Sequence, residues 1–65
     1  MESCYAFLSH FTNGTMPNRK NLERHYSPEF IDEAINLGYI IEIGKDDIGY
    51  AIYAITEKGI DKRDN

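Results

Sequence analysis

The feature that most constrains this 65-residue chain is a pair of strand-like segments that directly follow a well-capped helix. Residues 39–44 and 49–55 alternate with a period of two and are rich in β-branched and aromatic types. The polar segment between them, Lys45 to Ile48, is flanked by glycines, so we expect an antiparallel hairpin. Two strands alone are weak in water, and this hairpin must therefore lie against helices.

The helix before the hairpin has clear signals at both ends. Ser27 supplies a capping hydroxyl, Pro28 suits the first turn, and Glu29 is favoured by the positive end of the helix dipole. Gly38 is a typical residue to end a helix. The periodicity predicts an inward face of Phe30, Ile31, Ala34, Ile35 and Leu37, and an outward face of Glu29, Asp32, Glu33 and Asn36.

Two shorter helices are expected earlier in the chain. The first runs from Glu2 to Phe11 and ends near Thr12, with an apolar face of Cys4, Phe7, Leu8 and Phe11. The second has Pro17 in its first turn and Asn18 as a capping residue, and it presents only Leu22 and Tyr26 as apolar contacts. Its outer face carries Arg19, Lys20 and Arg24, with His25 beside them, which is either a solvated surface or a phosphate-contacting surface.

The end of the chain is expected to form only a short helical turn. Thr56 caps a segment from Glu57 to about Arg63, and Gly59 should keep that segment short or frayed. Residues 61–65 have mixed charge, so we expect a mobile tail.

Length and composition predict one domain over residues 1–65. A chain this short buries about 60% of the surface that its unfolded form exposes, so we expect help from a partner or a second copy, and a homodimer is the simplest form. The single cysteine and the lack of a long apolar run predict a cytoplasmic protein that does not enter a membrane. A net charge of −4 means that nucleic-acid binding has to rest on local patches.

The phrase from Ala34 to Ile40 leading into the hairpin, and the phrase from Tyr53 to Gly59 leaving it, resemble the winged helix-turn-helix superfamily. The pattern is most similar to MarR-like and PadR-like proteins and to small winged-helix proteins of phages and prophages, and it covers about residues 5 to 60. The resemblance implies an α+β fold of three helices, a two-stranded antiparallel wing and a short C-terminal helical turn.

The resemblance also implies a mechanism, in which residues 27–37 form the recognition helix in the major groove and residues 45–48 contact the minor groove or backbone. The implied function is DNA binding by a non-catalytic transcriptional regulator or by an accessory protein of a phage or mobile element. Candidate DNA-binding residues are Arg19, Lys20, Asn21, Arg24, His25, Asn36 and Lys45.

The acidity of the outward helix face keeps a second interpretation open. Three carboxylates on one short helix would stand near phosphates, and each unscreened contact opposes binding by about 1 kcal/mol in a water-like medium. The alternative is a protein-interaction module that docks onto a basic partner. Its candidate residues are Glu29, Asp32, Glu33, Asn36, Tyr50 and Tyr53, the tyrosines because one outer face of a two-stranded hairpin needs a cover.

Catalytic and metal chemistry find little support in the sequence. Cys4, His10 and His25 are the soft metal ligands, and their spacing matches no zinc signature. Cys4 lies on an apolar helix face, which is typical of a buried inert thiol. The glycines have ordinary roles at the ends of elements rather than in a phosphate loop. We therefore expect no enzyme activity, no cofactor and no metal.

Overall fold

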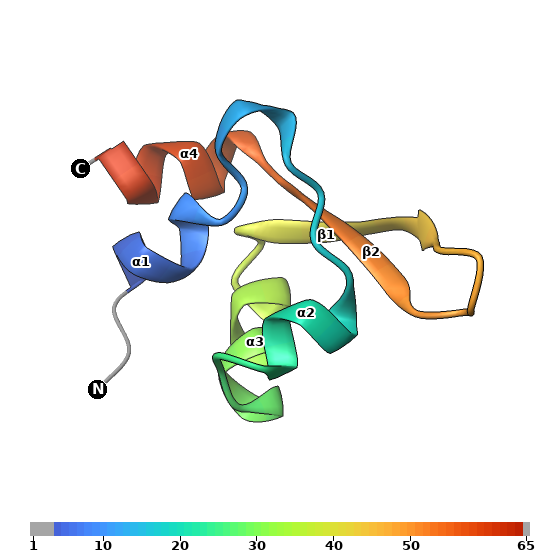
Figure 1. The fold of residues 1–65 in the computed structure, drawn as a ribbon. Helices are drawn as coiled ribbons and strands as arrows, with labels where there is room; N and C mark the ends of the chain where they lie inside the picture. The colour runs from blue at the N-terminus through green and yellow to red at the C-terminus, as the bar shows by residue number, and fades with distance from the viewer. Residues whose placement is uncertain (1–3, 65) are drawn as a thin grey trace.

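The computed structural model of the protein describes residues 4–64, apart from the side chains of Cys4 and Asn13. Within that range the chain forms four α-helices, one 3-10 turn and a two-stranded antiparallel sheet (Figure 1). This α+β arrangement is compatible with a winged-helix-like fold. In chain order the elements are α1 (Cys4–Ser9), η1 (Thr12–Gly14), α2 (Arg19–Glu23), α3 (Pro28–Asn36), β1 (Ile40–Lys45), β2 (Ala51–Ile55) and α4 (Glu57–Asp64).

The first helix is shorter than the prediction from Glu2 to Phe11. Its α-helical part ends at Ser9, and the next two amides bond three residues back rather than four. The hydroxyls of Ser9 and Thr12 bond to the carbonyl oxygens of Tyr5 and Ser9, at 2.6 and 2.8 Å, which competes with continued helix. The predicted start at Glu2 and the predicted burial of the Cys4 thiol lie outside the described residues.

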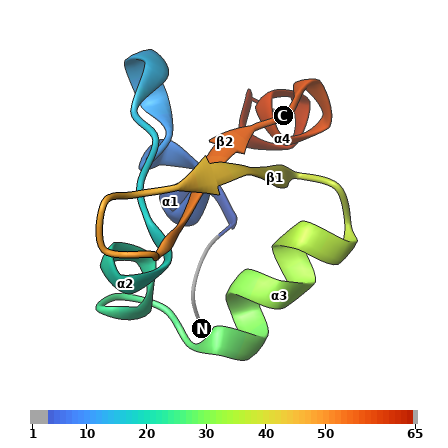
Figure 2. The same cartoon turned by 90° about the vertical axis from the view of Figure 1, so that its right-hand side faces the viewer.

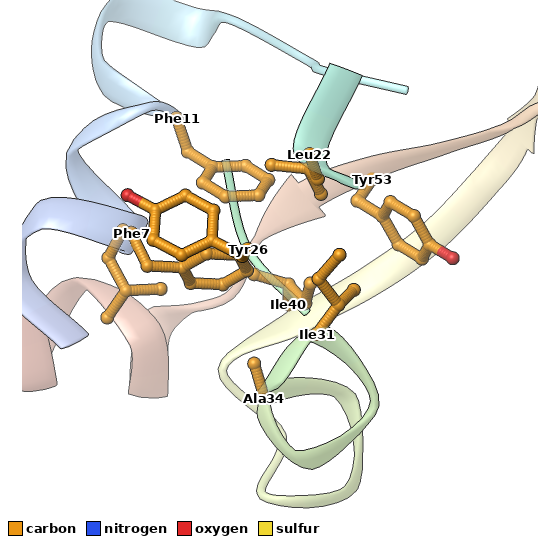
Figure 3. Packing of buried hydrophobic residues seen from close by; sticks show 9 residues of the cluster. Phe7, Phe11, Leu22, Tyr26, Ile31, Ala34, Ile40 and Tyr53 are labelled. Carbon is orange, nitrogen blue, oxygen red and sulfur yellow. The ribbon is translucent and has the colours of Figure 1, made fainter. Parts of the chain in front are cut away.

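The core lies where α1, α2, α3 and the hairpin meet (Figure 3). Phe7 sits at its centre, with its ring 4.9 Å from that of Tyr26 in an edge-on contact. Seven of the predicted inward residues of the helices lie within this core. Its buried members are Phe7, Leu8, Phe11, Leu22, Tyr26, Ile31, Ala34, Ile40 and Tyr53.

Helix α3 confirms the predicted capping. The Ser27 hydroxyl accepts from the amide of Phe30 at 3.2 Å, and Pro28 occupies the first turn. At the other end, Gly38 has a φ of 82°, and the amides of Gly38 and Tyr39 bond back to the carbonyls of the last turn. The predicted inward position of Leu37 is wrong, because this residue follows the last turn and remains 43% exposed.

The hairpin pairs in one continuous register except at Ile43, which is an extra residue between the pairs Glu42–Tyr53 and Gly44–Ile52. Ile40 and Tyr53 face the helices and are buried. Ile41 and Ile43 lie on the opposite face and are about half exposed.

The predicted place of Pro17 in a helix is wrong. This residue precedes the cap of α2 and is buried, and its carbonyl accepts from the amide of Tyr53 at 3.1 Å. Asn18 forms an isolated antiparallel bridge with Ile52. The connection between α1 and α2 therefore runs beside β2 and covers that edge of the sheet.

The predicted segment from Glu57 to about Arg63 is observed as α4, but it is a continuous helix rather than a short turn, because it continues through Gly59 to Asp64 and packs against α1. Gly59 has a different role from the predicted one. It is buried, and a Cβ at this position would collide with the carbonyl oxygen of Tyr39. Glycine therefore permits a close approach between α4 and the base of the hairpin. Residues 61–64 belong to α4, and the mobility expected of the tail stays a prediction.

Candidate nucleic-acid interface

The cap of α2 also fixes the tip of the hairpin. The side-chain oxygen of Asn18 accepts from the amide of Asn21 at 2.7 Å, which confirms the predicted cap. The nitrogen of the same side chain donates to Asp46 at 2.8 Å. One asparagine thus holds the start of α2 against the turn between β1 and β2, and Figure 2 shows the tip lying over α2 and away from α3.

A hollow of about 250 Å³ lies between α2 and this tip, open to solvent. It brings together two cations one helical turn apart, Lys20 and Arg24. Within residues 4–64 neither of them forms an ion pair. The complete lining is Asn18, Lys20, Asn21, Arg24 and Ile48.

An aromatic ring holds one of these cations in place. The amino group of Lys20 lies 5.7 Å from the ring centre of Tyr50, in a cation–π contact between α2 and the hairpin. Tyr50 is 37% exposed, and Ile48 at the tip is 74% exposed. The rim of the hollow therefore combines positive charge with accessible apolar surface.

The Asp46 carboxylate organises the hairpin turn from inside. One of its oxygens accepts from the amides of Ile48 and Tyr50, at 3.1 and 2.9 Å, and the other accepts from Asn18. Partial desolvation raises the pKa of Asp46, but the hydrogen bonds from Tyr50, Asn18 and Ile48 outweigh it and lower the pKa below its ordinary value. The carboxylate is therefore a structural acceptor in the turn.

Arg19 was predicted to contact DNA, but the structure places its guanidinium in a link between α2 and α3. Its Nε donates to Glu23 at 2.7 Å, and one terminal nitrogen donates to Asp32 at 2.8 Å. The same nitrogen lies 3.4 Å from the hydroxyl of Tyr53. The hydrogen bond to Glu23 raises the pKa of Arg19 against the effect of partial burial, and Asp32 raises it further. This cation is engaged within the fold and stands apart from the hollow.

The outward face of α3 is exposed as predicted, at Glu29, Asp32, Glu33 and Asn36. The four residues differ in their partners, because Asp32 is bound by Arg19 while Glu29 and Glu33 form no ion pair within the described chain. Glu29 and Glu33 lie one helical turn apart and make this face negative. Asn36 lies on this acidic face rather than beside Lys20 and Arg24.

The remaining candidates lie at different places. Asn21 lines the hollow, and Lys45 is the exposed last residue of β1 beside the tip. His25 follows the end of α2, where its ring stacks on that of His10 at 5.6 Å. The sequence reasoning missed Asn18 and Ile48 as residues of the hollow, although Asn18 was recognised as a cap, because their meeting depends on how the hairpin folds back.

The two tyrosines proposed for protein contacts have different environments. Tyr53 is 4% exposed and belongs to the core, so its candidacy as an interface residue is wrong. The register of the hairpin turns Tyr53 toward the helices, because it shares a face with Ile40. Tyr50 remains accessible beside Lys20.

The described residues contain no group of three or more histidine, cysteine or acidic side chains placed to hold a metal ion. Among the helices of residues 4–64, none has the length and apolar character needed to cross a bilayer. No protein-family model, curated protein or solved structure matches the chain.

Proposed function

We propose that this protein is a small winged-helix module that binds double-stranded DNA. The observation that carries the proposal is the convergence of Lys20 and Arg24 on one hollow beside the hairpin tip, both without an acidic partner in the described chain. Unpaired cations on one face of a domain supply the counterion release that drives binding to phosphates.

The order of elements supports the same proposal. Three helices precede an antiparallel hairpin, and the turn between α2 and α3 is short. The winged-helix resemblance predicted this order from the phrases at Ala34–Ile40 and Tyr53–Gly59. A regulator of transcription or an accessory protein of a mobile element is the role that such a module would serve.

A titration of a fluorescently labelled duplex of mixed sequence at low salt tests the proposal. Fluorescence anisotropy should rise with a dissociation constant of about 10 to 100 µM and should fall off steeply as salt is added. The absence of any binding in this range would refute DNA binding, because non-specific affinity is expected to appear there. Sedimentation of the same sample tests the predicted homodimer.

The acidic face of α3 supports a second candidate function, docking onto a basic protein. Glu29 and Glu33 are exposed and free of ion pairs in the described chain, and Leu37 beside them offers accessible apolar surface. Electrostatic complementarity of this kind selects partners of opposite charge.

Replacing Glu33 with lysine tests this second function. A pulled-down basic partner should be lost from Glu33→Lys while the circular dichroism spectrum stays that of the native protein. A partner that still binds the variant would exclude this face as its docking surface.

A further inference from the structure

The two outer surfaces of the helical layer differ in charge, and a duplex can approach only one of them closely. Lys20 and Arg24 on α2 are free of ion pairs in the described chain, and they face the hollow under the hairpin tip. Glu29 and Glu33 on α3 likewise form no ion pair within residues 4–64, and each carboxylate would repel phosphates if α3 lay in a groove.

We propose that DNA lies against α2 and the hairpin tip, with a backbone phosphate in the hollow of Lys20, Asn21 and Arg24, while α3 faces away from the duplex. This inference rests on the proposed DNA binding and specifies its geometry. It differs from the arrangement that the resemblance implies, in which α3 enters the major groove.

The donors of the hollow match the chemistry of a phosphodiester group. A guanidinium presents its N–H groups in a planar fork that binds two phosphate oxygens at once, and an ammonium adds a compact charge. Arg24, which caps the C-terminal end of α2, and Lys20, one turn before it, supply these two groups, and the hollow of about 250 Å³ leaves room between them and the tip. Tyr50 limits the freedom of Lys20, so less side-chain entropy is lost on binding.

The hairpin tip adds an apolar contact at the right place. Ile48 lines the hollow and is 74% exposed. A phosphate bound in the hollow would bring the neighbouring sugars and the edge of a groove toward Ile48. Proteins that bind the minor groove insert apolar side chains of this kind between base steps. Burial of this side chain against the duplex gives the tip a role that needs no positive charge.

The nearby acid Asp46 is compatible with this geometry. Both of its oxygens are occupied inside the turn, by the amides of Ile48 and Tyr50 and by the side chain of Asn18. These donors direct partial positive charge toward the carboxylate and offset its field at the hollow. On α3, the carboxylates of Glu29 and Glu33 have no such donors among the described residues.

Salt-dependent titrations of three double variants with the labelled duplex test the geometry. Lys20→Gln with Arg24→Gln keeps a polar side chain at each position but removes both positive charges. The control Lys58→Gln with Lys62→Gln changes the net charge equally on α4, which lies at the other end of the molecule from α2 (Figure 1). The third variant, Glu29→Gln with Glu33→Gln, removes the two unpaired charges of α3.

Loss of the cations of the hollow should weaken binding about tenfold for each cation at about 50 mM salt and should reduce the slope of log affinity against log salt by about two. The α4 control should reduce the slope by less than half of the reduction seen in the variant without Lys20 and Arg24. Neutralising α3 should leave the slope and the affinity within about twofold of the wild type, because at about 50 mM salt charges are screened beyond about 14 Å and α3 faces away from the duplex.

Two results would overturn the geometry while leaving DNA binding intact. One is a wild-type slope in the variant without Lys20 and Arg24. The other is a gain of affinity of about tenfold or more in the variant without Glu29 and Glu33, which would place α3 against the phosphates. A wild-type protein that binds no duplex at all would instead refute the proposed function itself. Circular dichroism spectra establish that each variant keeps the native fold.

Discussion

Helices α2 and α3 pack against each other and present opposite charges to solvent. On α2, Lys20 and Arg24 are unpaired within the described chain and face the hairpin tip. On α3, Glu29 and Glu33 are exposed and form no ion pair with any residue from 4 to 64. Arg19 joins the two helices, since it starts on α2 and binds Asp32 of α3.

Residue type alone does not make a cation available to a ligand. Arg19 and Arg24 belong to the same short segment, yet the first is held by two carboxylates and the second by none in the described chain. The difference comes from the orientation of α2, which turns Arg19 toward α3 and Arg24 toward the hairpin. The positive surface is therefore smaller than the sequence suggests, but it lies in one place.

The largest expected effect comes from removing the side chain that α2, α3 and the hairpin share. Tyr53→Ala should cost about 3–5 kcal/mol, because a buried aromatic ring is lost and a cavity remains. That loss is comparable to the whole stability of a domain this small, so urea denaturation should show no cooperative transition. Tyr53→Phe is the control, since it keeps the ring and removes only the contact at 3.4 Å from Arg19. A cooperative transition like that of the wild type in Tyr53→Ala would mean that the Tyr53 side chain does not stabilise the core, and Tyr53 would again be a candidate for the interaction surface.

Removing the link between the helices should have an intermediate effect. Arg19→Ala should lower the free energy of unfolding by about 1–2 kcal/mol, because it breaks two partly exposed ion pairs and loses the packing of the side-chain stem. Arg63→Ala is the matched control, since this arginine is similarly covered and its ion pair within residues 4–64 is with the neighbouring Asp64 on the same helix. Equal losses in the two variants would mean that Arg19 does not hold α2 against α3.

The smallest expected effect concerns the hairpin tip. Asp46→Ala should lower the melting temperature more than Asp47→Ala, because Asp46 accepts two hydrogen bonds within the turn and one from Asn18 at the start of α2. Asp47 is an exposed neighbour with the same charge.

The pH dependence of this difference follows from the lowered pKa of Asp46. The folded state favours the ionised carboxylate, so its contribution is complete above the ordinary carboxyl pKa and is lost as the pH falls through the lowered value. The two variants should therefore converge in melting temperature under acidic conditions. A gap between them that widens toward acidic pH would contradict this role.

Local signals in the sequence predicted the elements that depend on neighbouring residues. The caps at Asn18 and Ser27 and the helix end at Gly38 each involve atoms within a few residues along the chain, so residue type is enough to recognise them. The hairpin followed from its alternation and glycine-flanked turn. The prediction of an exposed acidic face on α3 was also correct, because helical periodicity determines which residues lie on the same side of a helix.

The sequence predicted only part of the candidate site. Lys20, Asn21 and Arg24 were named as candidates, and they do lie together at the hollow. Ile48 and Asn18 complete it from positions about thirty residues apart, where no periodic pattern connects them. The burial of Tyr53 and the pairing of Arg19 with Asp32 also depend on contacts between distant segments, which the sequence pattern does not reveal.

The sequence by itself determined the order of helices and strands, the cap of α2 at Asn18, both ends of α3, and a net charge of −4. These properties depend on composition and on short-range hydrogen bonding. Only the tertiary structure decided which hairpin face is buried, which arginine is neutralised and where the free cations gather. Those outcomes depend on contacts between segments that are distant in the chain. Tyr53 is buried, and Arg19 is paired with Glu23 and Asp32, because packing places these groups in contact with protein instead of water.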